Sequence, residues 1–203
     1  INYRHDNPYL ANPIEDFSFD EDSIDEHINL YEVFDDADLP YGGTLSFTCI
    51  YNEHISVDMS DSVAVFSAEE NWNGTEYLRI TARDDNNRSV NDYFYVTVDP
   101  TNDAPVAASA IEDFSFLEDT TNSDLDLNDV FTDPDLIYGD DLTYSFEDTQ
   151  HLEVEINDGV VTLTPEHNWN GTEAITLIAT DDSLAMVLDE VEVTITYRSD
   201  NPY

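Results

Sequence analysis

The sequence predicts an all-β protein made of two β-sandwich domains in tandem, and three observations support this. The chain repeats itself at a fixed offset, several segments alternate apolar and polar residues with a period of two, and turn residues separate those segments. No stretch shows convincing helical periodicity. A length of 203 residues is sufficient for two small domains.

The internal repeat defines the domain organisation. Ile14 to Phe19 recurs as Ile111 to Phe116, and Asn71 to Glu76 recurs as Asn168 to Glu173, both at an offset of 97 residues. A period this long indicates small autonomous domains more than a solenoid. We predict repeat 1 at 10–98, a calcium-binding linker at 99–106 and repeat 2 at 107–195, with connectors to neighbouring repeats at 1–9 and 196–203.

The two connectors also resemble each other. Tyr3 to Tyr9 matches Tyr197 to Tyr203, whereas the linker between the repeats has a different sequence. We therefore expect the chain to be one unit of a longer array that alternates two kinds of connector.

Strand signals are clearest in the second repeat. Glu173 to Thr180 and Asp189 to Tyr197 alternate apolar and polar residues, and so do Leu152 to Ile156 and Val160 to Leu163 on either side of the turn Asn157-Asp158-Gly159. About six or seven short strands per repeat fit a two-sheet Greek-key sandwich of immunoglobulin-like size.

Charge excludes several classes of function. The chain has 47 acidic residues against five basic ones, all of them arginine, and its formal net charge is −42. Such a surface repels nucleic acids and anionic membranes. No apolar run approaches the roughly 20 residues that a spanning helix needs, so we expect no membrane insertion by this segment. The hydrophobic share of 40% is sufficient for folded cores.

Covalent bracing is excluded by composition. Cys49 is the one cysteine, so no disulfide forms within the chain, and the absence of lysine excludes Lys–Asn isopeptide crosslinks. Phe146 takes the place of Cys49 in the second repeat, which predicts that Cys49 is a small core residue. Metal ions are the obvious alternative source of stiffness.

Acidic residues shared by the two repeats fall where strands end. They are Glu21 and Glu118 after the first strand, Asp36, Asp38, Asp133 and Asp135 before the third, and Asp84 and Asp181 after the sixth; the linker adds Asp99, Asn102 and Asp103. Strand ends gather at the poles of a sandwich. Carboxylate and amide oxygens are ligands that hard metal ions prefer, so this distribution indicates metal binding at the poles.

The second repeat resembles a bacterial or archaeal cadherin-like repeat. The motifs that support this are FLEDT at 116–120, DVFTDPDLIYGDDLTYSF at 129–146 and the run from Asp158 to Asp182, with an NDAP linker at 102–105. Resemblance to cadherins implies one calcium cluster at each junction. At the linker its ligands would be Glu21, Glu69, Asn71, Asp99, Asn102, Asp103, Asp133, Asp135 and Asp181, and the outer junctions would use Asp36, Asp38, Asp84, Glu118 and Glu166.

The chain departs from the cadherin pattern at the outer junctions. Asn2 and Thr196 stand where the linker has Asp99, and Asn71 and Asn168 stand where cadherins carry a glutamate. We therefore expect fewer ions, or none, at the outer junctions.

The resulting interpretation is an extracellular, cell-surface segment without catalytic activity. It would be part of an adhesin, stalk or fibre, would be stiffened by calcium, and would mediate adhesion or self-association with neighbouring repeats, copies of itself or surface glycans. His54 and His151 have no neighbouring ligands at zinc-like spacing, and no phosphate loop or nucleophile motif is present.

Three alternatives stay open at this point. A carbohydrate-binding accessory module of a secreted polysaccharide-degrading protein would present Trp and Tyr side chains in a row on one face, whereas a spacer would bury Trp72 and Trp169. A polymerising fibre subunit is a further possibility. Adaptation to salt would explain the total acidity without any specific ion site.

Overall fold

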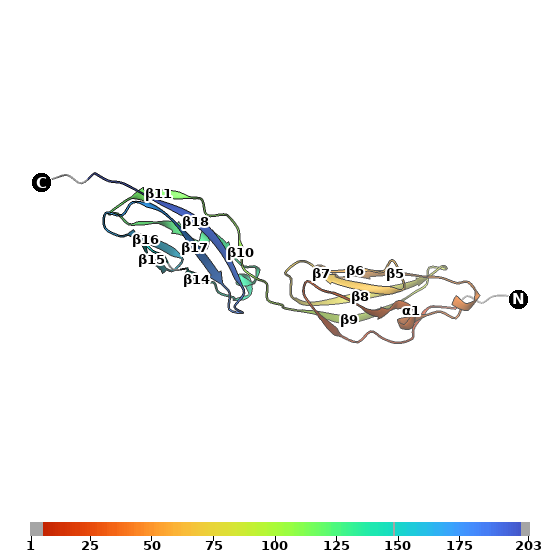
Figure 1. Cartoon of the computed structure of the whole chain (residues 1–203). Helices are drawn as coiled ribbons and strands as arrows, with labels where there is room; N and C mark the ends of the chain where they lie inside the picture. The colour runs from red at the N-terminus through yellow and green to blue at the C-terminus, as the bar shows by residue number, and fades with distance from the viewer. Residues whose placement is uncertain (1–5, 148, 200–203) are drawn as a thin grey trace. The chain divides into compact units, whose positions relative to one another are not determined.

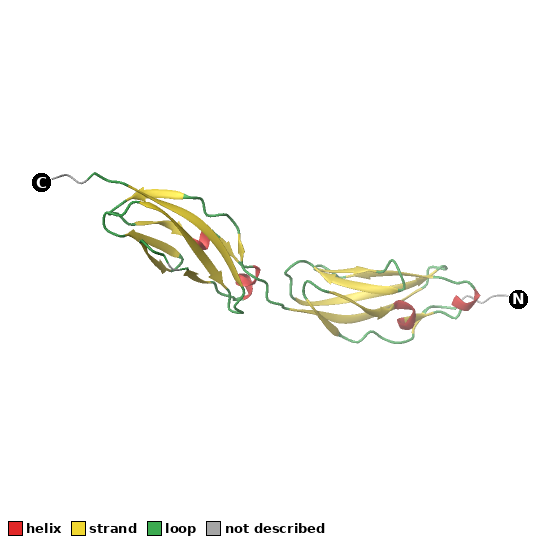
Figure 2. Cartoon of the chain, viewed as in Figure 1, coloured by secondary structure: helices red, strands yellow, loops and turns green. Residues whose placement is uncertain are grey.

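A computed structural model describes residues 6–147 and 149–199, and it divides the chain into two compact units. The first unit is Ile1–Thr101 and the second unit is Asn102–Tyr203. The matching motifs expected at the two ends lie partly outside the described residues. Strands dominate each unit, as Figure 2 shows, and the prediction of all-β sandwiches is confirmed.

The first unit contains a four-stranded sheet and a three-stranded sheet (Figure 1). The larger sheet has the order β2-β9-β8-β5 and the smaller one β3-β7-β6, while β1 and β4 form a separate pair. The elements in chain order are β1 Tyr9–Leu10, β2 Phe17–Asp20, β3 Ile24–Asn29, α1 Leu30–Val33, β4 Phe34–Asp35, η1 Leu39–Tyr41, β5 Leu45–Ile50, β6 Ile55–Asp58, β7 Val63–Ala68, β8 Gly74–Asp84 and β9 Ser89–Asp99.

The second unit repeats this topology. Its sheets have the orders β11-β18-β17-β14 and β12-β16-β15, with β10 paired to β13. The elements are β10 Val106–Ala107, β11 Phe114–Leu117, β12 Asn122–Asp126, η2 Leu127–Asp129, β13 Phe131–Thr132, η3 Pro134–Tyr138, β14 Thr143–Phe146, β15 Leu152–Asn157, β16 Val160–Pro165, β17 Gly171–Thr180 and β18 Met186–Thr196.

The tight turn predicted between β15 and β16 is present. Asn157 pairs with Val160, and the two residues between them, Asp158 and Gly159, have φ angles of 50° and 87°. Positive φ at both central positions is the type I′ geometry that suits the right-handed twist of a hairpin. The helical elements are single turns, which explains why the sequence showed no helical period.

Each unit has its own apolar core between its two sheets. The first core centres on Phe34, Phe66 and Phe94, and the second on aliphatic residues such as Leu163 and Leu177. Cys49 packs partly buried against the first core, and burial raises the pKa of its thiol to about 11. The thiol is therefore protonated at neutral pH and acts as a small apolar group.

Carboxylates hold loops to the sheets by accepting backbone N–H groups. Glu76 on β8 accepts the N–H groups of residues 53 to 55, and Asp92 on β9 accepts that of Ile14 at 2.7 Å. In the second unit, Asp189 accepts the N–H of Ile111 at 2.8 Å. These bonds join segments that are distant in sequence, in a chain that has no disulfide to do so.

The two cores can be perturbed separately. Phe66 and Leu163 occupy equivalent positions in β7 and β16, and both are buried. We expect Phe66→Ala to destabilise the first unit by about 3–5 kcal/mol and Leu163→Ala to destabilise the second by about 2–5 kcal/mol, because each leaves a cavity. Differential scanning calorimetry should show each variant lowering one transition alone. A shift of both transitions by either substitution contradicts separate cores.

Candidate metal centre

One pole of the second unit brings three carboxylates together. Asp133, Asp140 and Asp181 each offer one oxygen, and these oxygens all lie within 4.8 Å of one another. We call these residues the acidic trio. Within the described residues, no other group of three or more His, Cys, Asp or Glu side chains meets this criterion.

Asp133 reaches this position because it begins η3. It has extended backbone before Pro134, and its Oδ1 accepts the N–H of Asp135 at 2.8 Å, as an N-cap does. The side chain is 4% exposed, and its Oδ2 has no hydrogen-bond partner in the described part of the chain. A buried carboxylate oxygen without a partner is costly, so this atom indicates a missing ligand.

Asp181 and Asp140 come from loops on either side. Asp181 follows β17, and its Oδ1 accepts the N–H of Ala185 at 2.7 Å. Asp140 follows η3, and its Oδ1 accepts the N–H groups of Asp141 and Asp182. The Oδ2 of Asp140 is buried and has no partner among the described residues.

The start of the second unit is tied to the same pole. Asn102 donates its side-chain N–H to Asp181 Oδ2 at 2.9 Å, and the backbone N–H of Asp103 donates to Asp135 Oδ2 at 2.8 Å. The hydrogen-bonded network at this pole therefore contains five residues that the sequence predicted as ligands: Asn102, Asp103, Asp133, Asp135 and Asp181.

Electrostatics at this pole favour a bound cation. Burial raises the pKa of the Asp133 carboxyl, and the charges of Asp140, Asp135 and Asp181 raise it further, although the hydrogen bond from the Asp135 N–H lowers it. Two carboxylates about 4 Å apart repel by about 1 to 4 kcal/mol, depending on the local dielectric. A divalent cation would turn this repulsion into attraction.

The donor set fits calcium. All three members of the trio offer carboxylate oxygens, and Asn102, Asp103 and Asp135 add amide and carboxylate oxygens nearby. Calcium takes six to eight oxygen ligands, whereas structural zinc prefers histidine and cysteine. The residues therefore fit the ion that the cadherin resemblance implies.

Asp140 was missed by sequence reasoning. The prediction kept acids shared by both repeats, and the position of Asp140 in the first repeat is occupied by Gly43. The signal that could have identified it is the run Gly139-Asp140-Asp141, because acids clustered directly after a Gly often lie in a loop that approaches neighbouring loops.

The equivalent pole of the first unit keeps part of this arrangement. Asp36 Oδ1 accepts the N–H of Asp38, and Asp84 Oδ1 accepts the N–H of Arg88, as in the second unit. Here too the remaining oxygens of Asp36 and Asp84 lack partners among the described residues. Gly43, however, replaces the third carboxylate, and Arg88 stands where the second unit has Ala185.

Arg88 also places a positive group at this pole. Its guanidinium donates to the carbonyl oxygen of Asp6 at 2.8 Å, and the N–H of Asp6 donates to Asp38. Compared with the second unit, the pole of the first unit therefore has one carboxylate fewer and carries an additional positive side chain, the guanidinium of Arg88. Both differences weaken a metal site.

Glu21 and Glu118 are buried and bind backbone. Glu21 Oε1 accepts the N–H of Thr101 at 2.7 Å, and Glu118 Oε1 accepts that of Arg198 at 2.8 Å. Each carboxylate also receives a longer bond from an asparagine side chain. In each unit this glutamate thus fixes the segment that leaves the last strand.

Glu69 and Glu166 pair with histidines. Glu69 Oε2 lies 3.0 Å from His54 Nδ1, and Glu166 Oε2 lies 3.0 Å from His151 Nδ1. Their role as calcium ligands stays a prediction, as do the roles of Asn71, whose backbone N–H donates to Asp22, and of Asp99, whose carbonyl accepts the N–H of Glu21.

The two tryptophans are partly buried beside their turns. His54 stacks on Trp72 with ring centroids 4.8 Å apart, and His151 stacks on Trp169 at 4.7 Å. A Cβ on Gly74 would lie 2.8 Å from Trp72 Cζ2, so glycine is needed where the indole covers the turn. Both indoles contact the cores.

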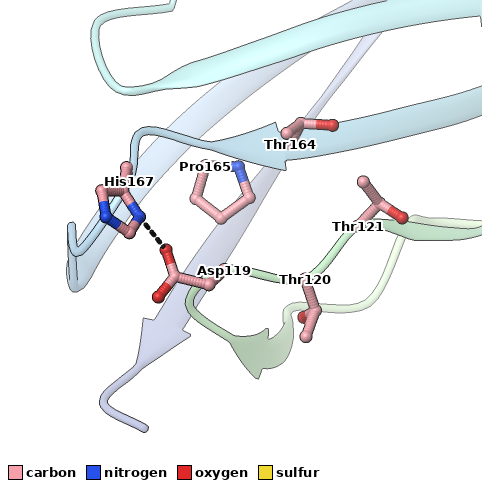
Figure 3. Close-up of a pocket in the computed structure, with 6 residues that line it drawn as sticks. All are labelled: Asp119, Thr120, Thr121, Thr164, Pro165 and His167. Carbon is pink, nitrogen blue, oxygen red and sulfur yellow. Dashed lines mark hydrogen bonds and ion pairs between the residues drawn. The ribbon is translucent and has the colours of Figure 1, made fainter. Parts of the chain in front are cut away.

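A surface pocket lies beside Glu118 in the second unit (Figure 3). It is lined by Asp119, three threonines, Pro165 and His167, and His167 Nδ1 lies 2.8 Å from Asp119 Oδ1. The hydrogen bond from the Asn168 N–H and the bond to His167 lower the pKa of the Asp119 carboxyl. The side chain of His167 is exposed, and its contact with Asp119 joins the loop after β16 to the loop after β11.

His54 provides a pH test of the histidine pairing. The hydrogen bond to Glu69 raises the pKa of His54, so its contribution to stability is present below the ordinary pKa of 6.5 and is lost as pH rises through the raised value. We expect the NMR titration midpoint of His54 to lie above 6.5 and to fall in Glu69→Gln. If Glu69 were a calcium ligand instead, calcium would lower the midpoint in the wild-type chain.

Comparisons with known proteins agree with this architecture. The model of a bacterial Ig domain family matches residues 102–196. Among solved structures, mouse cadherin-23 repeats EC22–24 align with a TM-score of 0.54 and 19% identity, covering 95% of this chain and 65% of that one. Protocadherin gamma C5 repeats EC1–3 align with a TM-score of 0.52 and 18% identity, covering 93% and 68%.

Other comparisons carry less weight. An endo-fucoidan hydrolase of glycoside hydrolase family 107 aligns with a TM-score of 0.41 and 18% identity, covering 95% of this chain and 29% of that one, and this likeness supports no argument. A search of curated proteins gave no match. The chain spans from 29% to 68% of the length of these three solved chains. Identity this low shows the fold alone, and at that level the resemblance is confirmed: the chain has the fold of a cadherin/Ig-like tandem repeat.

Proposed function

We propose that the chain is a non-catalytic structural segment of an extracellular, cell-surface adhesion protein, and that its second unit binds calcium at the acidic trio. The observation that carries the calcium proposal is the buried Oδ2 of Asp133, which has no partner in the described chain and faces two further carboxylates. No helix among the described residues is long and apolar enough to cross a membrane.

Calcium would act by removing repulsion and by restraining the linker. The trio would supply carboxylate ligands, and Asn102, Asp103 and Asp135 lie in the same network. Because Asn102 and Asp103 belong to the linker, a bound ion would fix the linker to the second unit. Contributions from Glu21, Glu69, Asn71 and Asp99 of the first unit remain part of the proposal.

Adaptation to salt explains a different part of the acidity. A net charge of −42 far exceeds what a cluster of this size neutralises, so most carboxylates are solvated surface. Solvation does not account for a carboxylate that is 4% exposed and lacks a partner among the described residues. The carbohydrate-binding alternative is weakened because Trp72 and Trp169 contact the cores.

Thermal unfolding at fixed high ionic strength tests the calcium site. We expect calcium to raise the unfolding temperature of the second unit above its value in chelator. The free energy of unfolding should rise by about 2.7 kcal/mol when calcium is 100-fold above its Kd. Asp133→Asn and Asp140→Asn should each weaken calcium binding about tenfold or more. The matched controls are Asp36→Asn in the first unit and Glu155→Gln on β15, which should leave this transition unchanged. If sodium chloride restores all the stability that chelation removes, the site proposal fails.

Small-angle X-ray scattering tests the restraint on the linker. Calcium at about 0.1 to 1 mM, the range that extracellular modules need, should narrow the range of chain dimensions. Asp133→Asn combined with Asp135→Asn should broaden that range while circular dichroism shows both sandwiches folded. Identical scattering for the wild-type chain and this variant, with calcium present, would count against calcium stiffening.

A further inference from the structure

The outer face of the larger sheet in the first unit carries no carboxylate along most of its two central strands, and the exception is Asp99 at the end of β9. Buried residues alternate along β8 and β9, so the residues between them point outward. From Thr75 to Arg83 on β8 and from Ser89 to Thr97 on β9, every outward residue is a threonine, serine, asparagine, tyrosine or arginine. In a chain with 47 acidic residues this absence calls for a cause.

Tyrosines form a connected group on this face. Tyr77 is paired in register with Tyr95, their ring centroids lie 4.7 Å apart, and Tyr93 stacks on Tyr77 at 5.9 Å. Each of the three side chains is about half exposed. We call this group, together with Arg79 and Arg83, the tyrosine face.

Two arginines lie among the tyrosines without a carboxylate partner. Arg79 is in register with Tyr93, and Arg83 with Ser89. The guanidinium of Arg79 lies over the ring of Tyr51 at 5.4 Å, and its Nε is buried without a hydrogen-bond partner in the described chain. Among the described residues, no carboxylate forms an ion pair with either arginine.

The second unit shows that the fold does not need these residues. In the same register, β18 places Met186, Leu188, Glu190 and Glu192 outward, opposite Thr180, Ile178, Thr176 and Ala174 of β17. Glu190 and Glu192 occupy the positions of Tyr93 and Tyr95. We call Met186, Leu188, Glu190 and Glu192 the acidic-apolar face.

The acidic-apolar face also has unexplained features. Met186 and Leu188 are 64% and 61% exposed and lie next to each other on the outward side of β18. The side chains of Glu190 and Glu192 make no ion pair with any described residue. Exposed apolar side chains next to charged ones are typical of interaction surfaces.

We propose that the tyrosine face of one copy binds the acidic-apolar face of a second copy. One face supplies two guanidinium groups and a cluster of aromatic rings, and the other supplies two carboxylates and two flexible apolar side chains. Opposite charges and apolar groups are thus both matched. A single occupant accounts for both faces, whereas a glycan would account for the tyrosine face alone.

This contact joins different surfaces of identical chains, so it is heterologous. Each copy keeps one free face of each kind after pairing, and further copies add to both ends unless the rotation closes a ring. The inference rests on the proposed structural role and names the partner, a second copy, together with the surfaces that it uses.

Net charge predicts an unusual dependence on salt. Two chains of charge −42 repel each other at long range, and salt screens that repulsion beyond about 8 to 10 Å at ordinary ionic strength. The contact itself includes apolar surface, which salt does not weaken. Association should therefore strengthen from low to moderate sodium chloride, whereas an interface of ion pairs alone would weaken.

A charge exchange between the two faces tests the proposal with the full chain. Sedimentation velocity should show concentration-dependent association of the wild-type chain, weakened about tenfold or more in Arg79→Glu/Arg83→Glu and equally in Glu190→Arg/Glu192→Arg. A mixture of these two variants should associate again. One chain with all four substitutions should associate like the wild type, whose net charge it shares.

Two further variants separate the contact from general charge. Tyr93→Glu/Tyr95→Glu introduces the residues that the second unit has at these positions, so the sheet should fold, and association should be lost. Glu153→Arg/Glu155→Arg, on exposed positions of β15, changes net charge as Glu190→Arg/Glu192→Arg does and should leave association intact.

The outcomes that overturn the proposal are distinct from failure of the calcium site. A wild-type chain that stays monomeric at every concentration and salt, or variants that do not restore each other in the mixture, would refute it. If the monomeric chain binds alginate and Arg79→Glu/Arg83→Glu does not, the tyrosine face binds an acidic polysaccharide instead. Calcium binding, measured in parallel by calorimetry, should be unchanged in all of these variants.

Discussion

The structure depends on how carboxylates are satisfied in a chain that has almost no cations to pair with them. Backbone N–H groups take that role: Asp92 and Asp189 hold the segments before β2 and β11, and Glu21 and Glu118 hold the segments after β9 and β18. A carboxylate that accepts N–H groups stays charged at modest cost even when it is buried. These bonds join residues 78 to 80 apart in sequence and so fix the ends of each sandwich.

This solution is incomplete at one pole of each unit, where buried oxygens of Asp36, Asp84, Asp133 and Asp140 have no partner among the described residues, and in the second unit three carboxylates meet there. Asp181 accepts N–H groups through both of its oxygens, whereas Asp133 and Asp140 accept them through Oδ1 alone, and their Oδ2 atoms receive none among the described residues. A cation with several oxygen ligands is the remaining way to compensate the charge.

Comparison of the two units separates what the fold requires from what it tolerates. The clamping acids occur in both units, and so do the tryptophan turns and the histidine–glutamate pairs. Asp140, Arg88 and the outward tyrosines and arginines of β8 and β9 occur in one unit only. Differences at matched positions on one scaffold cannot be explained by folding, so they are where specific binding is expected.

The sequence by itself determined the tandem repeat, the all-β class and the hairpin at Asp158-Gly159, because period-two alternation and turn chemistry are local properties of the chain. It also placed the shared acids at strand ends. Only the tertiary structure decided which of these acids meet. Asp140 joined the trio, Glu69 paired with a histidine 15 residues away, and Glu21 turned to the N–H of Thr101, 80 residues away. Strand pairing over such distances selects each partner, and no local pattern in the sequence encodes it.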